Sequence, residues 1–268
     1  MMTQTWDRVV YEGNGTEIGT EPLRGLINGD HAVVVLRGLL PAEVFAENKQ
    51  RILPLRDAAA VTQYVNGSLT LIGVFLVRYL SHVDDYFQDA RAADEVRASL
   101  GFDLTVRVRA KLREVLGLHR FDVAAEPDGR QYASSNLRIC RDTVGTPLHN
   151  DNIMRDGASS GLVLSRLRHQ LSCVVCLQGC ERGGELSIYQ KPWRPADEIY
   201  KIPNGLGYDM GVVAGTAAHN FRPETGDIYL LNPTYYHAVE PAYGVDRITL
   251  GFFFGFFDDR LQDGVTWV

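Results

Sequence analysis

The second half of the chain is a succession of short, strand-like runs separated by turn residues, and this texture limits the fold more than any other feature. From about residue 130, β-branched and aromatic runs such as YASSNLRIC, QLSCVVCLQ, GDIYLLN and RITLGFFFGFF alternate with Gly, Pro and Asn. Many short strands with frequent turns are typical of a sandwich or barrel of the jelly-roll kind. We therefore predict a fold that is α+β but mainly β.

The first half of the chain has a mixed texture. Helix-forming segments follow Pro41, Asp84 and Asp103, and all three residues are favoured at helix starts. We expect these helices to pack on one side of the jelly roll. A chain of 268 residues is long enough for one large domain. We predict a single domain over residues 1–268, with a supporting region at 1–129 and the β core at 130–268.

Charge and hydropathy exclude several classes of function. The net charge is −6 and the chain lacks the basic stripe of nucleic-acid-binding proteins. Its most apolar run, residues 69–80, is too short to span a membrane and contains Arg78. The N-terminus has no secretory signal pattern, so we expect a cytoplasmic protein. Because the charge argues against nucleic acid, we expect the substrate to be a small molecule. The sequence carries no signal for an oligomeric state.

Two histidine–carboxylate pairs could begin a metal site. In His149-Asn150-Asp151 the outer residues would share one face of a strand, so one ion could contact both side chains. In His82-Val83-Asp84 the same spacing falls at the entry to a predicted helix, where residues two apart lie about 200° apart around the axis. We therefore favour His149 and Asp151. Two histidines and one carboxylate are the ligands of non-haem Fe(II) oxygenases.

The third ligand must come from elsewhere, and His237 has the most informative context. Ten residues after it come Arg247 and Thr249, which would share one strand face. A guanidinium and a hydroxyl placed in this way could hold a carboxylate. The other candidates are His31, His119, His169 and His219, and His219 has no comparable partner downstream.

Three cysteines, Cys173, Cys176 and Cys180, form a spacing that resembles a metal site. They lie in an apolar, β-branched run that predicts a strand. On a strand Cys173 and Cys176 would point to opposite faces. We interpret them as small buried hydrophobic residues.

Together these motifs resemble the Fe(II)/2-oxoglutarate-dependent oxygenase superfamily, whose core is a double-stranded β-helix. The match includes the H-x-D pair, the distal histidine and the R-x-T pair, and it covers most of the predicted jelly roll. The resemblance implies that His149, Asp151 and His237 bind Fe(II), and that O₂ is a co-substrate. It also implies that 2-oxoglutarate chelates the iron while its far carboxylate pairs with Arg247 and Thr249.

More loosely, the layout is similar to a bacterial branch that contains indole-alkaloid halogenases and amino-acid halogenases and hydroxylases. Halogenases of that branch have Gly or Ala at the position of Asp151, which leaves room for a halide. The resemblance therefore implies hydroxylation of an amino acid or a specialised-metabolite intermediate, with desaturation or cyclisation as the alternative. Two other classes stay open: a cupin-like metalloenzyme that needs no 2-oxoglutarate, and a non-catalytic jelly-roll binding module.

Other candidates have weaker signals. Asn136 and Arg138 share a strand face before the metal motif, and they contact 2-oxoglutarate or substrate unless they form an outward-facing polar pair. The Pro- and Gly-rich stretch at 191–223 is long for a connection and is typical of a lid or binding loop. Four residues are candidates for lining the substrate pocket, although aromatic side chains in a β domain often belong to the core: Tyr132, Asn152, Trp193 and Trp267.

Overall fold

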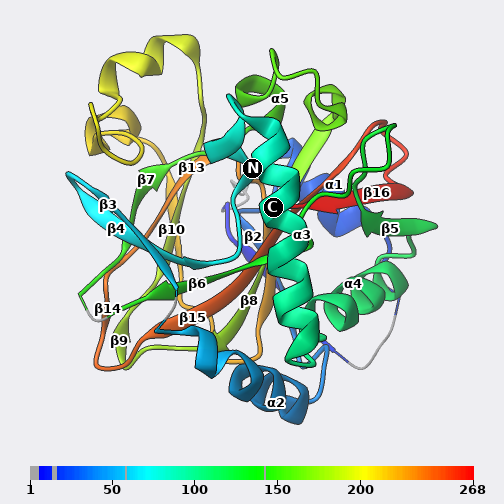
Figure 1. Ribbon diagram of the computed structural model, residues 1–268. Helices are drawn as coiled ribbons and strands as arrows, with labels where there is room; N and C mark the ends of the chain where they lie inside the picture. Colours follow the sequence, from blue (N-terminus) through cyan, green and yellow to red (C-terminus); the bar gives the residue numbers. More distant parts are fainter. Residues whose placement is uncertain (1–5, 14–16, 58, 142) are drawn as a thin grey trace.

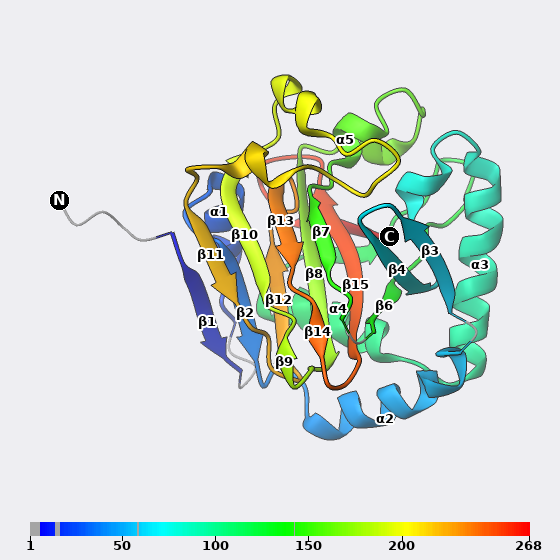
Figure 2. The same ribbon diagram turned by 90° about the vertical axis from the view of Figure 1, so that its left-hand side faces the viewer.

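Two facing β-sheets form the centre of the computed structural model (Figure 1). The larger one, here called the major sheet, has the strand order β1-β2-β12-β8-β15-β6-β4-β3, and β16 and β5 extend it beside β15. The smaller one, the minor sheet, has the order β11-β10-β13-β7 and lies in front of the major sheet in Figure 2. The structure describes residues 6–13, 17–57, 59–141 and 143–268.

Apart from the ten-residue strands β8 and β15, the strands are short, as the sequence texture predicts. The pairing is antiparallel except in the pairs β1–β2 and β5–β16. The strands of the major sheet are β1 (Arg8–Glu12), β2 (Val33–Arg37), β3 (Ala60–Tyr64), β4 (Gly67–Ile72), β5 (Arg120–Val123), β6 (Asn136–Cys140), β8 (His169–Gln178), β12 (Ile228–Leu231), β15 (Arg247–Phe256) and β16 (Asp263–Trp267). Those of the minor sheet are β7 (Thr146–His149), β10 (Leu186–Pro192), β11 (Ala218–Phe221) and β13 (Tyr235–Val239), and a separate pair is formed by β9 (Arg182–Gly183) and β14 (Ala242–Tyr243).

The helices lie mainly in the first half of the chain. No helix in the described ranges is long and apolar enough to cross a membrane. The α-helices are α1 (Glu21–Asn28), α2 (Ala42–Ile52), α3 (Val83–Ser99), α4 (Leu104–Val115) and the short α5 (Ile153–Asp156). Short 3₁₀ helices are η1 (Leu53–Leu55), η2 (Leu76–Tyr79), η3 (Val163–Arg166), η4 (Pro195–Tyr200) and η5 (Met210–Val213).

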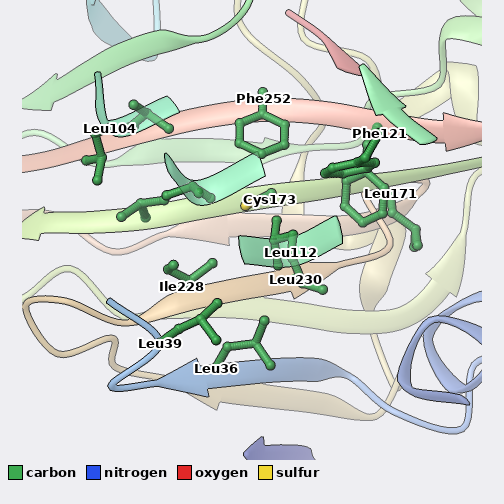
Figure 3. Packing of buried hydrophobic residues seen from close by; sticks show 14 of the residues in the cluster. Leu36, Leu39, Leu104, Leu112, Phe121, Leu171, Cys173, Ile228, Leu230 and Phe252 are labelled. Carbon is green, nitrogen blue, oxygen red and sulfur yellow. The ribbon is translucent and has the colours of Figure 1, made fainter. Parts of the chain in front are cut away.

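The largest hydrophobic cluster fills the space between the major sheet and helices α1, α2 and α4. Figure 3 shows Leu112 of α4 beside Cys173 and Leu230 of the sheet. Alternate strand residues point away from these helices and toward the minor sheet, because side chains on a strand alternate between faces. Helices α1, α2 and α4 thus cover one face of the major sheet, as predicted, and the opposite face forms a pocket with the minor sheet.

The cysteine pair follows the same alternation. Cys173 belongs to the helix-facing cluster. Cys176 lies instead on the side of Arg247, whose positive charge acts on its thiol. Burial raises the pKa of Cys176 to about 11, so this thiol is protonated at neutral pH. The two cysteines therefore do not converge on a common ion.

The first 129 residues contribute more than helical support. Strand β2 pairs with both β1 and β12, and β4 pairs with β6. Strand β5 joins the far end of the major sheet through β16. The major sheet is therefore built from both halves of the chain, and the boundary near residue 130 does not separate two packing units.

Candidate active site

Three side chains that commonly bind metals converge between the two sheets. His149 at the end of β7 and His237 on β13 are direct partners in the minor sheet, and their ring centroids lie 4.2 Å apart. Oδ2 of Asp151 lies 3.7 Å from Nε2 of His149 and 3.9 Å from Nε2 of His237. The potential ligand atoms lie within 4.8 Å of one another, and no other such group is found in the described part of the chain. This donor set suits Fe(II) and leaves coordination positions for other ligands.

Asp151 reaches the histidines from a turn rather than from a strand. Strand β7 ends at His149, and the backbone N–H of Asp151 donates to the carbonyl of Pro233 at 2.8 Å. The next residue, Asn152, caps helix α5 by accepting a hydrogen bond from the N–H of Arg155. The predicted convergence is present, but the strand alternation used to predict it does not extend to Asp151.

The competing pair behaves as a helix start. His82 precedes α3, and Asp84 in its first turn forms an ion pair with Arg130 at 2.6 Å. No third ligand joins His82 and Asp84 among the residues that the structure describes.

Backbone carbonyls orient both imidazoles toward the common centre. Nδ1 of His149 lies 2.8 Å from the carbonyl of Pro147, and Nδ1 of His237 lies 2.9 Å from that of Tyr235. When Nδ1–H donates to these oxygens, Nε2 carries the free lone pair that a metal requires. Burial, followed by the neighbouring His149, lowers the pKa of His237 to about 3. His237 is therefore neutral at physiological pH, which suits metal binding.

A buried guanidinium without a counter-charge lies across the same cavity. Arg247 and Thr249 on β15 line the cavity that contains the three metal-binding side chains. Arg247 is 4% exposed, and its Nη2 donates to the hydroxyl of Tyr229 at 2.9 Å. No carboxylate in the described ranges forms an ion pair with it. A buried charge is costly unless a partner neutralises it, so the site fits an anionic ligand between Arg247 and the metal-binding group.

The other strand residues predicted near the co-substrate separate from each other. Arg138 lies opposite Thr249 in the sheet and lines the cavity. Asn136 is fully buried opposite Gly251 in the sheet and does not line the cavity. Its Nδ2 donates to the carbonyl of Val74 at 3.3 Å. Its Oδ1 atom has no hydrogen-bond partner. Arg138 is therefore placed to contact a ligand directly, whereas Asn136 is hydrogen-bonded to the backbone of Val74 outside the cavity.

Asn152 and Trp267 line a second cavity next to the first. The two cavities share Asp151, Phe253 and Val268. Trp267 is 1% exposed and packs on Phe253 with ring centroids 5.9 Å apart. Both predicted residues thus line a cavity that includes the candidate ligand Asp151 and does not include Arg247.

Trp193 and Tyr132 do not line either cavity. Trp193 packs under the guanidinium of Arg155, whose Cζ lies 4.7 Å from the ring centroid. Arg155 also donates to Oδ1 of Asn150 at 2.6 Å. Asn150 lies between His149 and Asp151 in the chain. Trp193 therefore contacts Arg155, which in turn contacts the segment that carries His149 and Asp151, and not the cavity itself. Tyr132 lines a separate cleft along α3, where it packs on Phe87.

Three features of the site have little signal in the sequence. Tyr229 and Phe75 reach Arg247 and Arg138 from distant segments, and only the sheet topology brings them together. The long segment between β10 and β11 also contacts the site. Gly207 has a φ of +74°, and a Cβ there would lie 1.9 Å from the carbonyl oxygen of Leu148 and 3.2 Å from Cβ of His149. The Pro- and Gly-rich composition of this segment predicts a functional loop, but nothing in the sequence indicates that the loop packs against the strand of His149.

Comparison with known proteins agrees with this geometry. Residues 16–262 match a family model described as carrier-protein-independent halogenase WelO5. The chain is 26% identical over 222 residues to leucinostatins biosynthesis cluster protein S of Purpureocillium lilacinum, a match that spans 80% of this chain and 85% of the relative. It is 31% identical over 176 residues to the L-gamma-glutamyl-L-propargylglycine hydroxylase of Streptantibioticus cattleyicolor, over 64% of this chain and 63% of the relative.

Among solved structures, the fold is similar to that of an N-substituted L-amino acid dioxygenase from Burkholderia ambifaria in complex with α-ketoglutarate. The TM-score is 0.60 at 13% sequence identity, and the match covers 92% of this chain and 90% of the dioxygenase. This likeness confirms the jelly-roll architecture of the 2-oxoglutarate oxygenases.

Proposed function

This chain belongs to the carrier-protein-independent halogenase family WelO5 and is an Fe(II)- and 2-oxoglutarate-dependent oxygenase; we propose that it hydroxylates a C–H bond of a small molecule. The observation that carries the proposal is Asp151, whose carboxylate lies beside Nε2 of both His149 and His237. A third protein ligand at this place occupies the position that a halide would need. Hydroxylation is therefore favoured over halogenation.

In the proposed site, His149, Asp151 and His237 hold the iron. Their chemistry fits the metal, because two neutral imidazoles and one anionic oxygen suit Fe(II) and offset part of its charge. The backbone hydrogen bonds at Nδ1 keep both rings in the orientation that presents Nε2. Bound iron together with 2-oxoglutarate and O₂ supplies the oxidising power, and the protein positions the reactants and excludes water.

Arg247 is proposed to hold the far carboxylate of 2-oxoglutarate, assisted by Thr249. The support is the burial of Arg247 and the lack of an ion-pair partner for it among the described residues. The hydroxyl of Tyr229 accepts one N–H of the guanidinium and limits its orientation. A carboxylate is the partner that the remaining N–H groups would bind most strongly.

The substrate is proposed to be an amino acid derivative or a related biosynthetic intermediate. This proposal is supported by two relatives: one is named as a hydroxylase of a γ-glutamyl dipeptide and the other as a dioxygenase of N-substituted amino acids.

We further propose that residues 1–268 act as one oxygenase domain, since strands from both halves of the chain form the major sheet. All four cysteines are free, which favours a reducing compartment such as the cytoplasm.

The test begins with purified protein under anaerobic conditions. Addition of Fe(II) and 2-oxoglutarate should produce a weak visible charge-transfer band, and a screen of amino acid derivatives should identify a compound that stimulates succinate release. A product that has gained one oxygen atom supports hydroxylation, whereas loss of two hydrogen atoms indicates desaturation or cyclisation.

Asp151→Gly is the decisive variant. It should abolish hydroxylation while leaving the fold intact, because it removes the only carboxylate of the proposed ligand set. Asp84→Gly, in the competing motif, is the matched control and should retain full turnover. Unchanged hydroxylation in Asp151→Gly would remove Asp151 from the ligands and defeat the proposal.

A further inference from the structure

The carboxylate of Asp151 is held less directly than the two imidazoles of the candidate iron site. Each imidazole has a backbone carbonyl within hydrogen-bonding distance of its Nδ1. Within the described ranges, no donor forms a hydrogen bond with the carboxylate of Asp151, whose Oδ2 lies 3.7 and 3.9 Å from Nε2 of His149 and His237. The direction of this ligand is therefore set by the turn that carries it.

One residue contacts both sequence neighbours of Asp151. The guanidinium of Arg155 donates from Nη1 to Oδ1 of Asn150 at 2.6 Å, and its backbone N–H donates to Oδ1 of Asn152 at 3.1 Å. Between them, the N–H of Asp151 donates to the carbonyl of Pro233. Asp151 is thus bracketed by two bonds to a residue that lines neither of the two cavities.

Asn150 depends on Arg155 for its side-chain hydrogen bond. Asn150 is 7% exposed, and its Nδ2 is buried without a partner in the described part of the chain. A guanidinium only donates, so the amide has to turn its oxygen toward Arg155. Without that donor the whole amide would be buried and unpaired, a costly state that it could leave only by moving. Such a movement would displace the backbone of the neighbouring Asp151.

The guanidinium of Arg155 is itself fixed on two further sides. Its Nε and Nη2 donate to the two carboxylate oxygens of Asp156 at 2.6 and 3.0 Å. Its Cζ lies 4.7 Å from the ring centroid of Trp193. The bidentate pair fixes the plane of the guanidinium, and the aromatic ring supports one of its faces. An ammonium group could not reproduce this combination of contacts.

Trp193 connects this arrangement to the loop between β10 and β11. Its Nε1 donates to Oε1 of Glu198 at 2.9 Å, and the hydroxyl of Tyr208 donates to the same oxygen at 2.8 Å. The backbone N–H of Tyr208 donates to the carbonyl of Leu148 at 2.8 Å, just before the first histidine ligand. The loop therefore contacts the metal-binding segment at Leu148 directly and at Arg155 through Trp193.

We propose that Arg155 is a positioning residue of the iron site: it sets the direction of the Asp151 carboxylate through Asn150, and Trp193 holds it in place. This inference rests on the proposed function and adds the residues that orient one of its metal ligands. Removal of a residue that orients a metal ligand typically costs about 10- to 100-fold in metal affinity.

The test measures Fe(II) affinity by anaerobic titration, followed by the visible band at saturating 2-oxoglutarate. Arg155→Gln should weaken Fe(II) binding roughly 10- to 100-fold. The band of the iron-saturated variant should also shift, because Asp151 would meet the metal in a different geometry. Arg155→Lys keeps the charge but not the planar fork, so it should recover part of the affinity, and it keeps the comparison available if Arg155→Gln does not fold. The bond from the backbone N–H to Asn152 persists in both variants, which therefore isolate the guanidinium.

Arg130→Gln is the matched control. Like Arg155, Arg130 lies over an aromatic ring, with its Cζ 4.6 Å from the centroid of Phe87, and its Nε donates to the nearby Asp128 at 2.8 Å. It lines the cleft along α3, which contains none of the candidate iron ligands. Arg130→Gln removes the same kinds of contact and should leave both the Fe(II) affinity and the band unchanged.

A double variant tests whether Arg155 acts through Asn150. Asn150→Ala removes the acceptor and should weaken Fe(II) binding on its own. Addition of Arg155→Gln to Asn150→Ala should lower the affinity by no more than about twofold further, because the connection is already broken. A purely structural role of Arg155 would instead make the two losses multiply.

Three outcomes would overturn the inference: unchanged Fe(II) affinity in Arg155→Gln, an equal loss in Arg130→Gln, and losses that multiply fully in the double variant. Each comparison is made against a wild-type complex that shows the visible band. Failure of the proposed function would instead remove the band from the wild-type protein, so the two failures are distinguishable.

Discussion

The two walls of the pocket bury polar side chains in opposite ways. On the minor-sheet wall, the Nδ1 atoms of His149 and His237 each lie at hydrogen-bonding distance from a backbone carbonyl, which leaves Nε2 of each ring facing the pocket. On the major-sheet wall, Arg247 and Arg138 are charged and have no carboxylate partner among the described residues. One wall presents lone pairs and therefore suits a cation, whereas the other presents N–H donors and therefore suits anions. The two walls therefore suit ligands of opposite charge.

The largest effect is expected on the minor-sheet wall. His237→Ala should weaken Fe(II) binding by more than about 100-fold. Loss of a residue that only orients a ligand costs about 10- to 100-fold in metal affinity, and loss of the ligand itself should cost more. The measurement is an anaerobic Fe(II) titration followed by the 2-oxoglutarate band. His82→Ala, from the other H-x-D pair, serves as the control and should bind Fe(II) as the wild type does. Equal losses in the two variants would contradict the proposed ligand set.

On the major-sheet wall, Arg247→Gln should weaken 2-oxoglutarate binding by roughly 10- to 100-fold and leave Fe(II) affinity almost unchanged. The reason is that Arg247 acts on the anion and not on the metal. Titration of the visible band with 2-oxoglutarate gives the affinity, and Arg247→Lys should recover only part of it, because a lysine cannot reproduce the two-pronged hold. If Arg247→Gln lost Fe(II) as severely as it lost 2-oxoglutarate, the two walls would not act separately.

A third change tests whether the loop between β10 and β11 packs against the strand of the minor sheet that carries His149. Gly207→Ala places a Cβ 1.9 Å from the Leu148 carbonyl, whereas Gly215→Ala, in the same loop and at nearly the same φ, meets no atom within 4 Å. Both variants carry the backbone cost of the left-handed region. Overpacking should therefore lower the free energy of unfolding of Gly207→Ala by about 1–3 kcal/mol beyond that of Gly215→Ala. Thermal or chemical denaturation measures the difference, and equal destabilisation would show that the loop does not press on the strand of His149.

The smallest effect concerns the pH dependence of the metal-free protein. The pKa of His237 is lowered to about 3 in the folded state, mainly by burial, against about 6.5 for an unperturbed histidine. Below pH 6.5 the unfolded chain therefore binds a proton that the folded chain excludes, and the free energy of unfolding falls as the pH falls. Between pH 6.5 and 5.5 this contributes about 1 kcal/mol. Denaturation curves of wild type and His237→Gln should differ by that pH-dependent part, and parallel curves would mean that His237 titrates normally.

Much of the site follows from local patterns in the chain. The H-x-D pair, the distal histidine and the R-x-T pair could be identified because each depends on residue types at short spacing. The placement of Asp151 shows the limit of such reasoning, since its carboxylate reaches the histidines from a turn held by Pro233 and not from the strand that the spacing suggested. The aromatic candidates were harder to place, because an aromatic side chain is equally suited to a core and to a pocket. Trp267 lies beside the site, and Tyr132 lies along α3.

By itself, the sequence determined the class of fold, the helices that cover one face and the residues able to bind iron, because strand and helix periodicity and the identity of donor atoms are local properties. Only the tertiary structure decided which charges remain without a partner. The lack of an ion-pair partner for Arg247 and Arg138 within the described ranges depends on strands that are distant in the chain and adjacent in the sheets. The contacts of these residues with Tyr229 and Phe75 depend on the same strands. Electrostatic compensation acts through space over a few ångströms, so it cannot be determined until every neighbour of a charge is known.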